Sequence, residues 1–315
     1  MNIRLIGRLA LILAFITPIS WWMGRVSYTW LPVEASAEAQ LIDEVFSLFV
    51  ALGTAVFLGV AGTIGYCLIF NRAGKYDNSD GPPIEGNIPL EVVWTLLPIA
   101  LVLFLSTYSY QHYEKMGIQG PMQVVHFHNP LGMEPAYAAE SADQKPIEEI
   151  EVYARQWVWE FRYPQHNVTT TELHLPVDRR VHLTMQTEDV IHGFYIPAFR
   201  VKQDIDPNHV TELEFTPVLE GAYRLDNSQF SGTYAAVMNA DVFVESLEEY
   251  DRWLADAARS TPRPATNKAF TEYARKEEQG FGGWPSIAPA PPPLVNYPTQ
   301  QGRKVPSAPT TLRES

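Results

Sequence analysis

The sequence predicts a membrane-anchored, all-β protein, with transmembrane helices followed by a small antiparallel β-sandwich or barrel. Two observations indicate this fold class. Long apolar runs occur in the first third of the 315 residues, where they are long enough to cross a bilayer. From about Glu148, apolar and polar residues alternate with a period of two, which is typical of strands with one buried face.

Two of the apolar runs are predicted to be transmembrane helices. Residues 45–70 carry no charged side chain, and residues 92–110 form a second run of sufficient length. Pro98 interrupts the second run, but membrane helices tolerate proline because neighbouring groups satisfy the freed backbone. A third, shorter run at residues 9–23 precedes the small residues Ala35-Ser36-Ala37, so it is either a cleaved signal peptide or an additional span.

Basic residues predict the orientation of the spans. Arg4 and Arg8 precede the first run, and Arg72 and Lys75 lie between the second and the third. Basic residues near membrane ends prefer the cytoplasmic side. Placing both groups there leaves Arg25 as the one exception and puts the β domain on the outer side. We therefore expect an integral protein of the cytoplasmic membrane, in contact with lipid.

The chain is expected to have four parts. They are a signal peptide or extra span (residues 1–37), a transmembrane hairpin (41–112), the outer β domain (113–258) and a proline-rich tail, extended or disordered (259–315). Ser246 and Glu249 form a capping box that predicts a short helix after the last strand. The net charge of −13 argues against a nucleic-acid partner.

Four co-linear stretches carry a resemblance to a known family. They are PLEVVWTLLP at residues 89–98, QWVWEFRYP at 156–164, DVIHGFYIP at 189–197 and FRVKQD at 199–204. Together with the paired spans, they resemble subunit II of the cytochrome oxidases, over about residues 41–254. The loop at residues 79–87 and the N-terminal extension look most like the cyanobacterial members.

The resemblance implies a cupredoxin-like outer domain that packs on partner subunits. Subunit I of the family holds the hemes and one copper and reduces oxygen, and subunit III is a further expected partner. In a cyanobacterium the membrane would be cytoplasmic or thylakoid, with the β domain on the periplasmic or lumenal side.

The family's dinuclear copper centre uses six positions of the outer domain. Two of them match here, His192 and Met238, whereas Asn227 and Ser231 stand in place of the cysteines, Ala235 in place of the second histidine and Gln229 in place of a glutamate. Two thiolates must bridge the copper ions, and an amide and a hydroxyl cannot replace them. The single cysteine of the chain, Cys67, lies in a predicted span. We therefore expect no metal or other cofactor on this chain, with binding of one ion by His192 and Met238 as the weaker alternative.

Two further positions match family residues with known roles. Trp157 corresponds to the tryptophan through which electrons from cytochrome c reach the copper. Without copper behind it, Trp157 is read with Trp159 as a core or interface aromatic. Glu91 corresponds to a glutamate at the mouth of a proton channel into subunit I. It is read either as that proton site or as a solvated carboxylate favoured by the helix dipole.

The function expected from the resemblance is subunit II of a terminal oxidase that reduces oxygen to water. Family members without the copper centre are associated with quinol, so a membrane quinol is the expected donor, plastoquinol in a cyanobacterium. One alternative is a cytochrome c oxidase in which the protein donor reduces a heme directly. A related enzyme such as a nitric-oxide reductase is also compatible with the resemblance, as is a non-catalytic scaffold or assembly subunit, against which Glu91 argues mildly.

Overall fold

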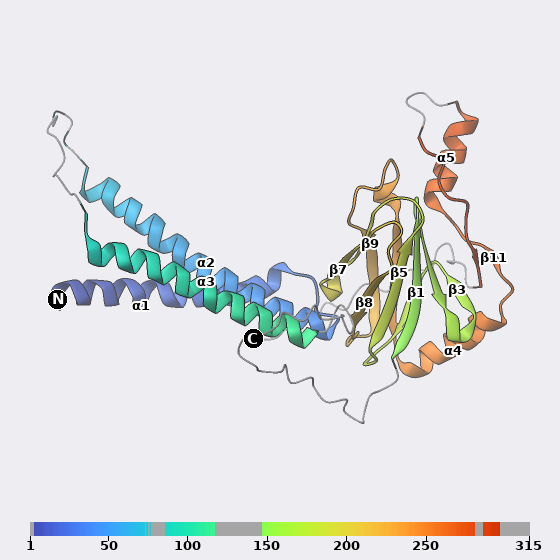
Figure 1. Ribbon diagram of the computed structural model, residues 1–315, viewed down its shortest axis with the longest axis horizontal. Helices are drawn as coiled ribbons and strands as arrows, with labels where there is room; N and C mark the ends of the chain where they lie inside the picture. The colour runs from blue at the N-terminus through green and yellow to red at the C-terminus, as the bar shows by residue number, and fades with distance from the viewer. Residues whose placement is uncertain are drawn as a thin grey trace. The chain divides into compact units, whose positions relative to one another are not determined.

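A computed structural model describes residues 3–72, 74, 76, 86–116, 147–280 and 286–296. The chain forms two compact units (Figure 1). The membrane unit comprises residues 1–31 and 41–115, and the outer unit comprises residues 32–40 and 116–315.

The membrane unit consists of three helices: α1 (Ile3–Val26), α2 (Ala37–Phe70) and α3 (Ile88–Met116). All three contain a stretch that is long and apolar enough to cross a membrane. The two predicted spans are thus helical, and the shorter first run belongs to a third helix. A short 3-10 turn, Ser27–Trp30, follows α1.

Small residues bring α1 and α2 together. A Cβ placed on Gly24 would lie 3.0 Å from Cβ of Ala51, so the two helices approach closely at this glycine. Ser47 Oγ donates a hydrogen bond of 2.8 Å to the carbonyl oxygen of Gly24. Small residues and hydroxyl groups at helix contacts are typical of membrane bundles, which lack a hydrophobic driving force between helices. The first helix is therefore packed as a component of the bundle.

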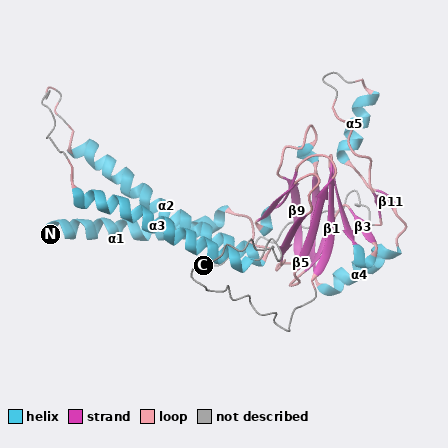
Figure 2. Cartoon of the chain, in the orientation of Figure 1, coloured by secondary structure: helices cyan, strands magenta, loops and turns pink. Residues whose placement is uncertain are grey.

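The outer unit is a sandwich of two five-stranded sheets, in the orders β3-β2-β1-β5-β8 and β4-β10-β9-β6-β7 (Figure 2). The strands are β1 (Glu148–Arg155), β2 (Val158–Tyr163), β3 (Val168–Thr170), β4 (Leu173–Pro176), β5 (Val181–Thr187), β6 (His192–Ile196), β7 (Val201–Ile205), β8 (Thr211–Phe215), β9 (Gly221–Asn227) and β10 (Asn239–Glu245). The expected β-sandwich is confirmed, but its sheets are not purely antiparallel, since β1 pairs with β5 and β4 with β10 in parallel. Alternation of residues specifies the buried face of a strand and leaves the direction of its neighbour open.

The core lies between the inward faces of the two sheets. Its largest fully buried side chains include Trp159, Phe161, Phe194 and Phe215. The helix α4 (Leu247–Arg259) follows the last strand, and its first turn is capped by Ser246, whose Oγ accepts from the backbone N–H of Glu249. The predicted N-cap is confirmed, and the carboxylate of Glu249 accepts from the Ser246 hydroxyl group at 3.1 Å.

The chain after α4 is more ordered than its proline content predicted. It contains α5 (Lys268–Glu278) and a pair of short strands, β11 (Arg263–Pro264) and β12 (Leu294–Val295). Ala269 and Val295 are completely buried. The expectation of an extended or disordered tail therefore does not describe residues 263–280 and 286–296, because a few apolar side chains and backbone hydrogen bonds anchor them. Residues 297–315 lie outside the described residues.

The segment between α1 and the long part of α2 is built into the outer unit. The backbone N–H of Ala35 donates to the carbonyl of Ala198 at 3.0 Å, and the Ala35 carbonyl accepts from Val218 N–H at 2.9 Å. Ser36 Oγ donates to the Phe199 carbonyl at 3.0 Å. Both Ala35 and Ser36 are fully buried. These contacts anchor Ala35 and Ser36 in the outer unit.

We expect Ala35→Leu to lower the free energy of unfolding of the outer unit by about 1–3 kcal/mol, because the larger side chain overpacks a filled site. Hydrogen exchange of outer-unit peptides in the purified complex measures this change. Gln40→Leu is the control, since Gln40 is exposed. Equal protection in the Ala35→Leu and Gln40→Leu variants would contradict the structural role of this segment.

Candidate functional site: the copper-ligand positions

Two chain segments meet at the positions that correspond to copper ligands. His192 begins β6, Asn227 ends β9, and residues 228–238 form the loop between β9 and β10. The segments are neighbours because β6 pairs with β9, with Phe194 opposite Asn227. Ala235 begins a 3-10 turn in this loop. The structure therefore brings together the residues that the motif comparison aligned.

Asn227 occupies the centre of the site and uses its whole side chain in hydrogen bonds. Its Oδ1 accepts from the backbone N–H groups of Gly193 at 2.9 Å and Gln229 at 3.2 Å. Its Nδ2 donates to Ser231 Oγ at 2.8 Å and makes a weaker contact with Met238 Sδ at 3.6 Å. A partly buried amide is stabilising only when its donors and acceptors are satisfied, and here they are. The loop is thus held by a network of neutral groups at the positions where the family has metal ligands.

Gln229 links the loop to the neighbouring strand β7. Its Nε2 donates to Asp204 Oδ2 at 2.7 Å. A glutamate at this position would place a second carboxylate against Asp204, and two like charges at this distance repel. The amide of Gln229 therefore suits its carboxylate neighbour.

His192 is completely buried, and its partner is Asp189. The ring Nε2 lies 3.0 Å from Asp189 Oδ1 and donates to it, because a carboxylate oxygen accepts. The other ring nitrogen, Nδ1, is buried and has no hydrogen-bond partner among the described residues. The imidazole also makes an edge contact with Trp159, at a centroid distance of 6.2 Å.

Asp189 accepts hydrogen bonds from four groups at the edge of the site. Besides His192, these are the backbone N–H groups of Gln156 and Val190, both at 2.7 Å, and the hydroxyl group of Thr187 at 3.2 Å. Burial by itself raises the pKa of Asp189, but the hydrogen bonds from His192, Gln156 and Val190 outweigh it and lower the pKa from 3.8 to about 2. Sequence reasoning missed Asp189 and Gln156, although both lie within the recognised motifs.

The donors at this site do not fit a dinuclear copper centre. Such a centre needs two thiolates that bridge the ions. The single cysteine of the chain, Cys67, lies in α2 of the membrane unit. The described part of the chain also contains no group of three or more His, Cys, Asp or Glu side chains arranged to hold a metal ion. His192 and Met238 are the two family ligands that remain.

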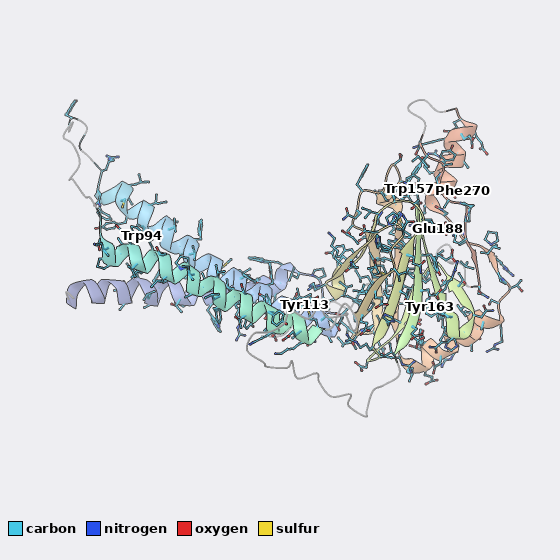
Figure 3. All side chains as sticks on the ribbon, in the orientation of Figure 1. Trp94, Tyr113, Trp157, Tyr163, Glu188 and Phe270 are labelled. Carbon is cyan, nitrogen blue, oxygen red and sulfur yellow. The ribbon has the colours of Figure 1, made fainter. Side chains whose placement is uncertain are left out.

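Trp157, labelled in Figure 3, and Trp159 are core side chains that contact the loop. Trp157 is 3% exposed, donates from Nε1 to the Ser231 carbonyl at 3.0 Å and packs edge-on against Tyr234. Trp159 is 1% exposed and donates to the Met238 carbonyl at 3.4 Å. Both indoles therefore support the loop, which agrees with their reading as core aromatics.

Glu91 lies in the first turn of α3 and takes part in capping that helix. Asn87 is the N-cap, since its Oδ1 accepts from Leu90 N–H at 3.2 Å. Glu91 Oε1 in turn accepts from Asn87 N–H at 3.2 Å. This reciprocal arrangement supports a structural role for Glu91 at the helix N-terminus, and it leaves the carboxylate exposed to solvent.

We expect Asp189→Asn to destabilise the outer unit by about 1–2 kcal/mol near neutral pH, after allowance for partial exposure of the carboxylate. The pKa of Asp189 is lower in the folded chain, so its contribution is complete above pH 3.8 and is lost as the pH falls towards 2. Hydrogen exchange of outer-unit peptides measures the difference, which should narrow between about pH 4 and pH 2. The exposed Asp206→Asn is the control. A constant difference across this range would contradict the assignment.

Two family models match the chain. Residues 20–112 match "Cytochrome C oxidase subunit II, transmembrane domain", and residues 167–246 match "Cytochrome C oxidase subunit II, periplasmic domain". The periplasmic domain of subunit II of the cytochrome oxidase of Bradyrhizobium japonicum is 25% identical and aligns with 34% of this chain and 90% of that domain, with a TM-score of 0.33.

Two relatives are named after different electron donors. "Cytochrome c oxidase subunit 2" of Synechocystis is 35% identical over 280 residues, which are 81% of this chain and 83% of the relative. "Quinol oxidase subunit 2" of Bacillus subtilis is 26% identical over 203 residues, which are 63% of this chain and 56% of the relative. The two family models describe transmembrane helices followed by a domain on the periplasmic side. The match to the first relative covers most of both chains. The chain therefore belongs to the cytochrome c oxidase subunit II family, as a subunit of a membrane-bound heme-copper oxidase.

Proposed function

We propose that this subunit serves a terminal oxidase that takes electrons from a membrane quinol, and that its outer unit holds no copper. The observation that carries the proposal is the lack of bridging thiolates. Asn227 and Ser231 occupy the cysteine positions, and they hydrogen-bond to each other at 2.8 Å. Ala235 removes the second imidazole as well.

The choice of quinol follows from what the copper centre does in the family. Copper in subunit II receives electrons from a soluble protein, whereas a quinol delivers electrons from the bilayer directly to the hemes of subunit I. A chain without the copper ligands lacks the relay that the first route uses, whereas the second route does not need it. The similarity to a quinol oxidase subunit supports this choice. The partner subunits would be I and III, with the hemes and one copper in subunit I.

A second candidate donor is cytochrome c. The more similar of the two relatives described above, at 35% identity, is named a cytochrome c oxidase subunit. In that case a cytochrome bound at the outer face would reduce a heme of subunit I without a copper relay. The two candidates differ in their donor, and they agree on the absence of copper from this chain.

Oxygen uptake by the purified complex distinguishes the donors. We expect rapid uptake with a quinol, none above background with reduced cytochrome c, and one copper per complex. Uptake with cytochrome c alone would favour the second candidate. Two additional copper atoms per complex would show that the ligand alignment is incorrect.

Restoring the missing ligands tests the alignment directly. We expect the triple variant Asn227→Cys, Ser231→Cys and Ala235→His to gain about two copper atoms per chain, since His192 and Met238 complete the ligand set. Elemental analysis of the assembled complex measures this gain. Ala235→His alone supplies no thiolate and is the control. An assembled triple variant without extra copper would contradict the correspondence of these positions.

Glu91 is proposed as the proton-uptake site at the cytoplasmic end of α3, in addition to its capping role. Glu91→Gln keeps an oxygen that accepts from Asn87 N–H but removes the ionisable group. We expect turnover to fall by about a hundredfold, which is the lower end of the effects of single proton-transfer groups. The control is Glu114→Gln, an exposed carboxylate near the other end of the same helix. Unchanged turnover in Glu91→Gln would leave Glu91 with the capping role alone.

A further inference from the structure

The turn between β1 and β2 is buried, although turns usually face solvent. β1 ends at Arg155 and β2 begins at Val158, so Gln156 and Trp157 form a two-residue turn. Connecting segments usually run over the protein surface, because their backbone groups then bond to water. Gln156 is nevertheless 8% exposed and Trp157 is 3% exposed. Other parts of the chain therefore cover this turn.

The loop between β9 and β10 covers the turn on one side. Gln156 Nε2 and Trp157 Nε1 both donate to the carbonyl oxygen of Ser231, at 2.6 Å and 3.0 Å. A Cβ placed on Gly232 would lie 2.8 Å from Cζ2 of Trp157, so the backbone of the loop lies directly on the indole. The ring of Tyr234 packs edge-on against the same indole, at a centroid distance of 5.1 Å. The loop is thus the first layer over Trp157.

The ordered chain after α4 forms a second layer on the turn and the loop. We call this part, residues 263–280 and 286–296, the C-terminal clasp. The backbone N–H of Ala290 donates to the carbonyl oxygen of Gln156 at 2.6 Å. Lys276 Nζ of α5 lies 5.5 Å from the centroid of the Tyr234 ring. The clasp therefore contacts both the turn that carries Trp157 and the aromatic ring that packs on Trp157.

Asn267 joins the two parts of the clasp. Its side chain is buried, and its Oδ1 accepts from Phe270 N–H at 3.1 Å, which caps α5. Its Nδ2 donates to the carbonyl oxygen of Ala290 at 3.0 Å. The next residue, Lys268, donates to Oδ1 of Asn239 at the start of β10 at 3.0 Å. One amide therefore fixes both α5 and the residue that bonds to the turn.

The far end of the clasp is anchored at a sheet edge. The backbone N–H of Asn296 donates to the Thr169 carbonyl oxygen at 2.8 Å, and Thr169 N–H donates to Asn296 Oδ1 at 3.1 Å. Thr169 belongs to β3, which is the edge strand of its sheet and so presents unpaired backbone groups. The clasp is thus held at the sheet edge and at the β1–β2 turn.

We propose that the C-terminal clasp closes the end of the sandwich that contains Trp157 against soluble redox proteins, and so restricts the oxidase to a donor from the membrane. This inference rests on the proposed function. An α-helix with its side chains is about 10 Å wide, so α5 keeps a docked protein that much further from the loop beneath it. The missing copper ligands remove the relay, and the clasp covers the surface above it.

Hydroxyl-radical labelling of the complete oxidase, read by mass spectrometry, measures the exposure of Trp157 and Tyr234. The test chain ends at residue 262, so it keeps both five-stranded sheets and α4 but lacks the clasp. The control chain ends at residue 296 and keeps the whole clasp. We expect labelling of Trp157 and Tyr234 to rise several-fold in the shorter chain and to stay unchanged in the control.

Asn267→Ala loosens the clasp without shortening the chain, and it also serves if the shorter chain does not assemble. Hydrogen exchange of the Ala290 N–H, which bonds to Gln156, measures opening. We expect this exchange to become about tenfold faster, as for the loss of one helix cap and one hydrogen bond. Glu277→Ala, an exposed carboxylate on the same helix, is the control.

Electron entry is measured in the copper-restored triple variant, with reduced cytochrome c as the probe and stopped-flow absorbance as the readout. We expect copper reduction to be about tenfold faster when this chain ends at residue 262 than at residue 296, which is within the range of association rates among variants of one interface. Asn267→Ala should also raise the rate. Because it changes no charge, attraction of a basic cytochrome does not explain that rise.

Each result either supports or overturns the inference. Higher labelling of Trp157 and faster copper reduction without the clasp support it. Equal labelling in the chains that end at residues 262 and 296, or a wild-type Ala290 N–H that exchanges like a free peptide, overturns the closure. Higher labelling with equal rates of copper reduction overturns the exclusion of protein donors. A wild-type complex that does not oxidise quinol overturns the proposed function, whereas the labelling result still decides on the closure.

Discussion

The side chain of Asn227 determines the arrangement of the outer unit at the copper-ligand positions. This amide lies at the end of β9. It bonds to Gly193 of β6 and to three residues of the loop between β9 and β10, Gln229, Ser231 and Met238. A loop of this length has to be held by internal bonds, because irregular backbone in a folded domain otherwise leaves polar groups unsatisfied. Bridging metal ions would hold the loop by coordination, whereas here hydrogen bonds between neutral groups do so.

The remaining contacts of the site follow from this network. Ser231 presents its carbonyl oxygen to both Gln156 Nε2, at 2.6 Å, and Trp157 Nε1, at 3.0 Å. The Met238 carbonyl accepts from Trp159. The two indoles therefore pack behind the loop as supports. Satisfied polar networks in a low-dielectric interior are specific and rigid, which explains how the loop keeps its shape with few of the family's ligands.

The membrane unit concentrates its polar groups at the outer end. Along most of their length the helices present apolar side chains, but His112, Glu44, Tyr108 and Tyr28 gather where α1, α2 and α3 reach the outer surface. Glu91, by contrast, lies at the opposite end of α3 and caps its first turn. The carboxylate at the outer end, Glu44, therefore lies beside a histidine, whereas the carboxylate at the other end, Glu91, caps a helix.

The sequence by itself determined the two long spans, the start of the β domain near Glu148, the capped helix α4 and the lack of thiolates. Each of these features can be found in the sequence without knowledge of tertiary contacts, because periodicity and capping residues are local patterns and the cysteines can simply be counted. The same applies to the alignment of His192 with Asn227, Ser231 and Met238, which came from the motif resemblance.

Tertiary structure alone decided the features that depend on contacts between distant segments. The parallel pairing of β1 with β5, the burial of Ala35 and Ser36 in the outer unit and the order of residues 263–280 and 286–296 all involve partners far away in the chain. The bonds of Asp189 to Gln156 and of Gln229 to Asp204 are likewise non-local. A residue's type limits which bonds it forms, but only the folded chain determines which partner lies within reach of it.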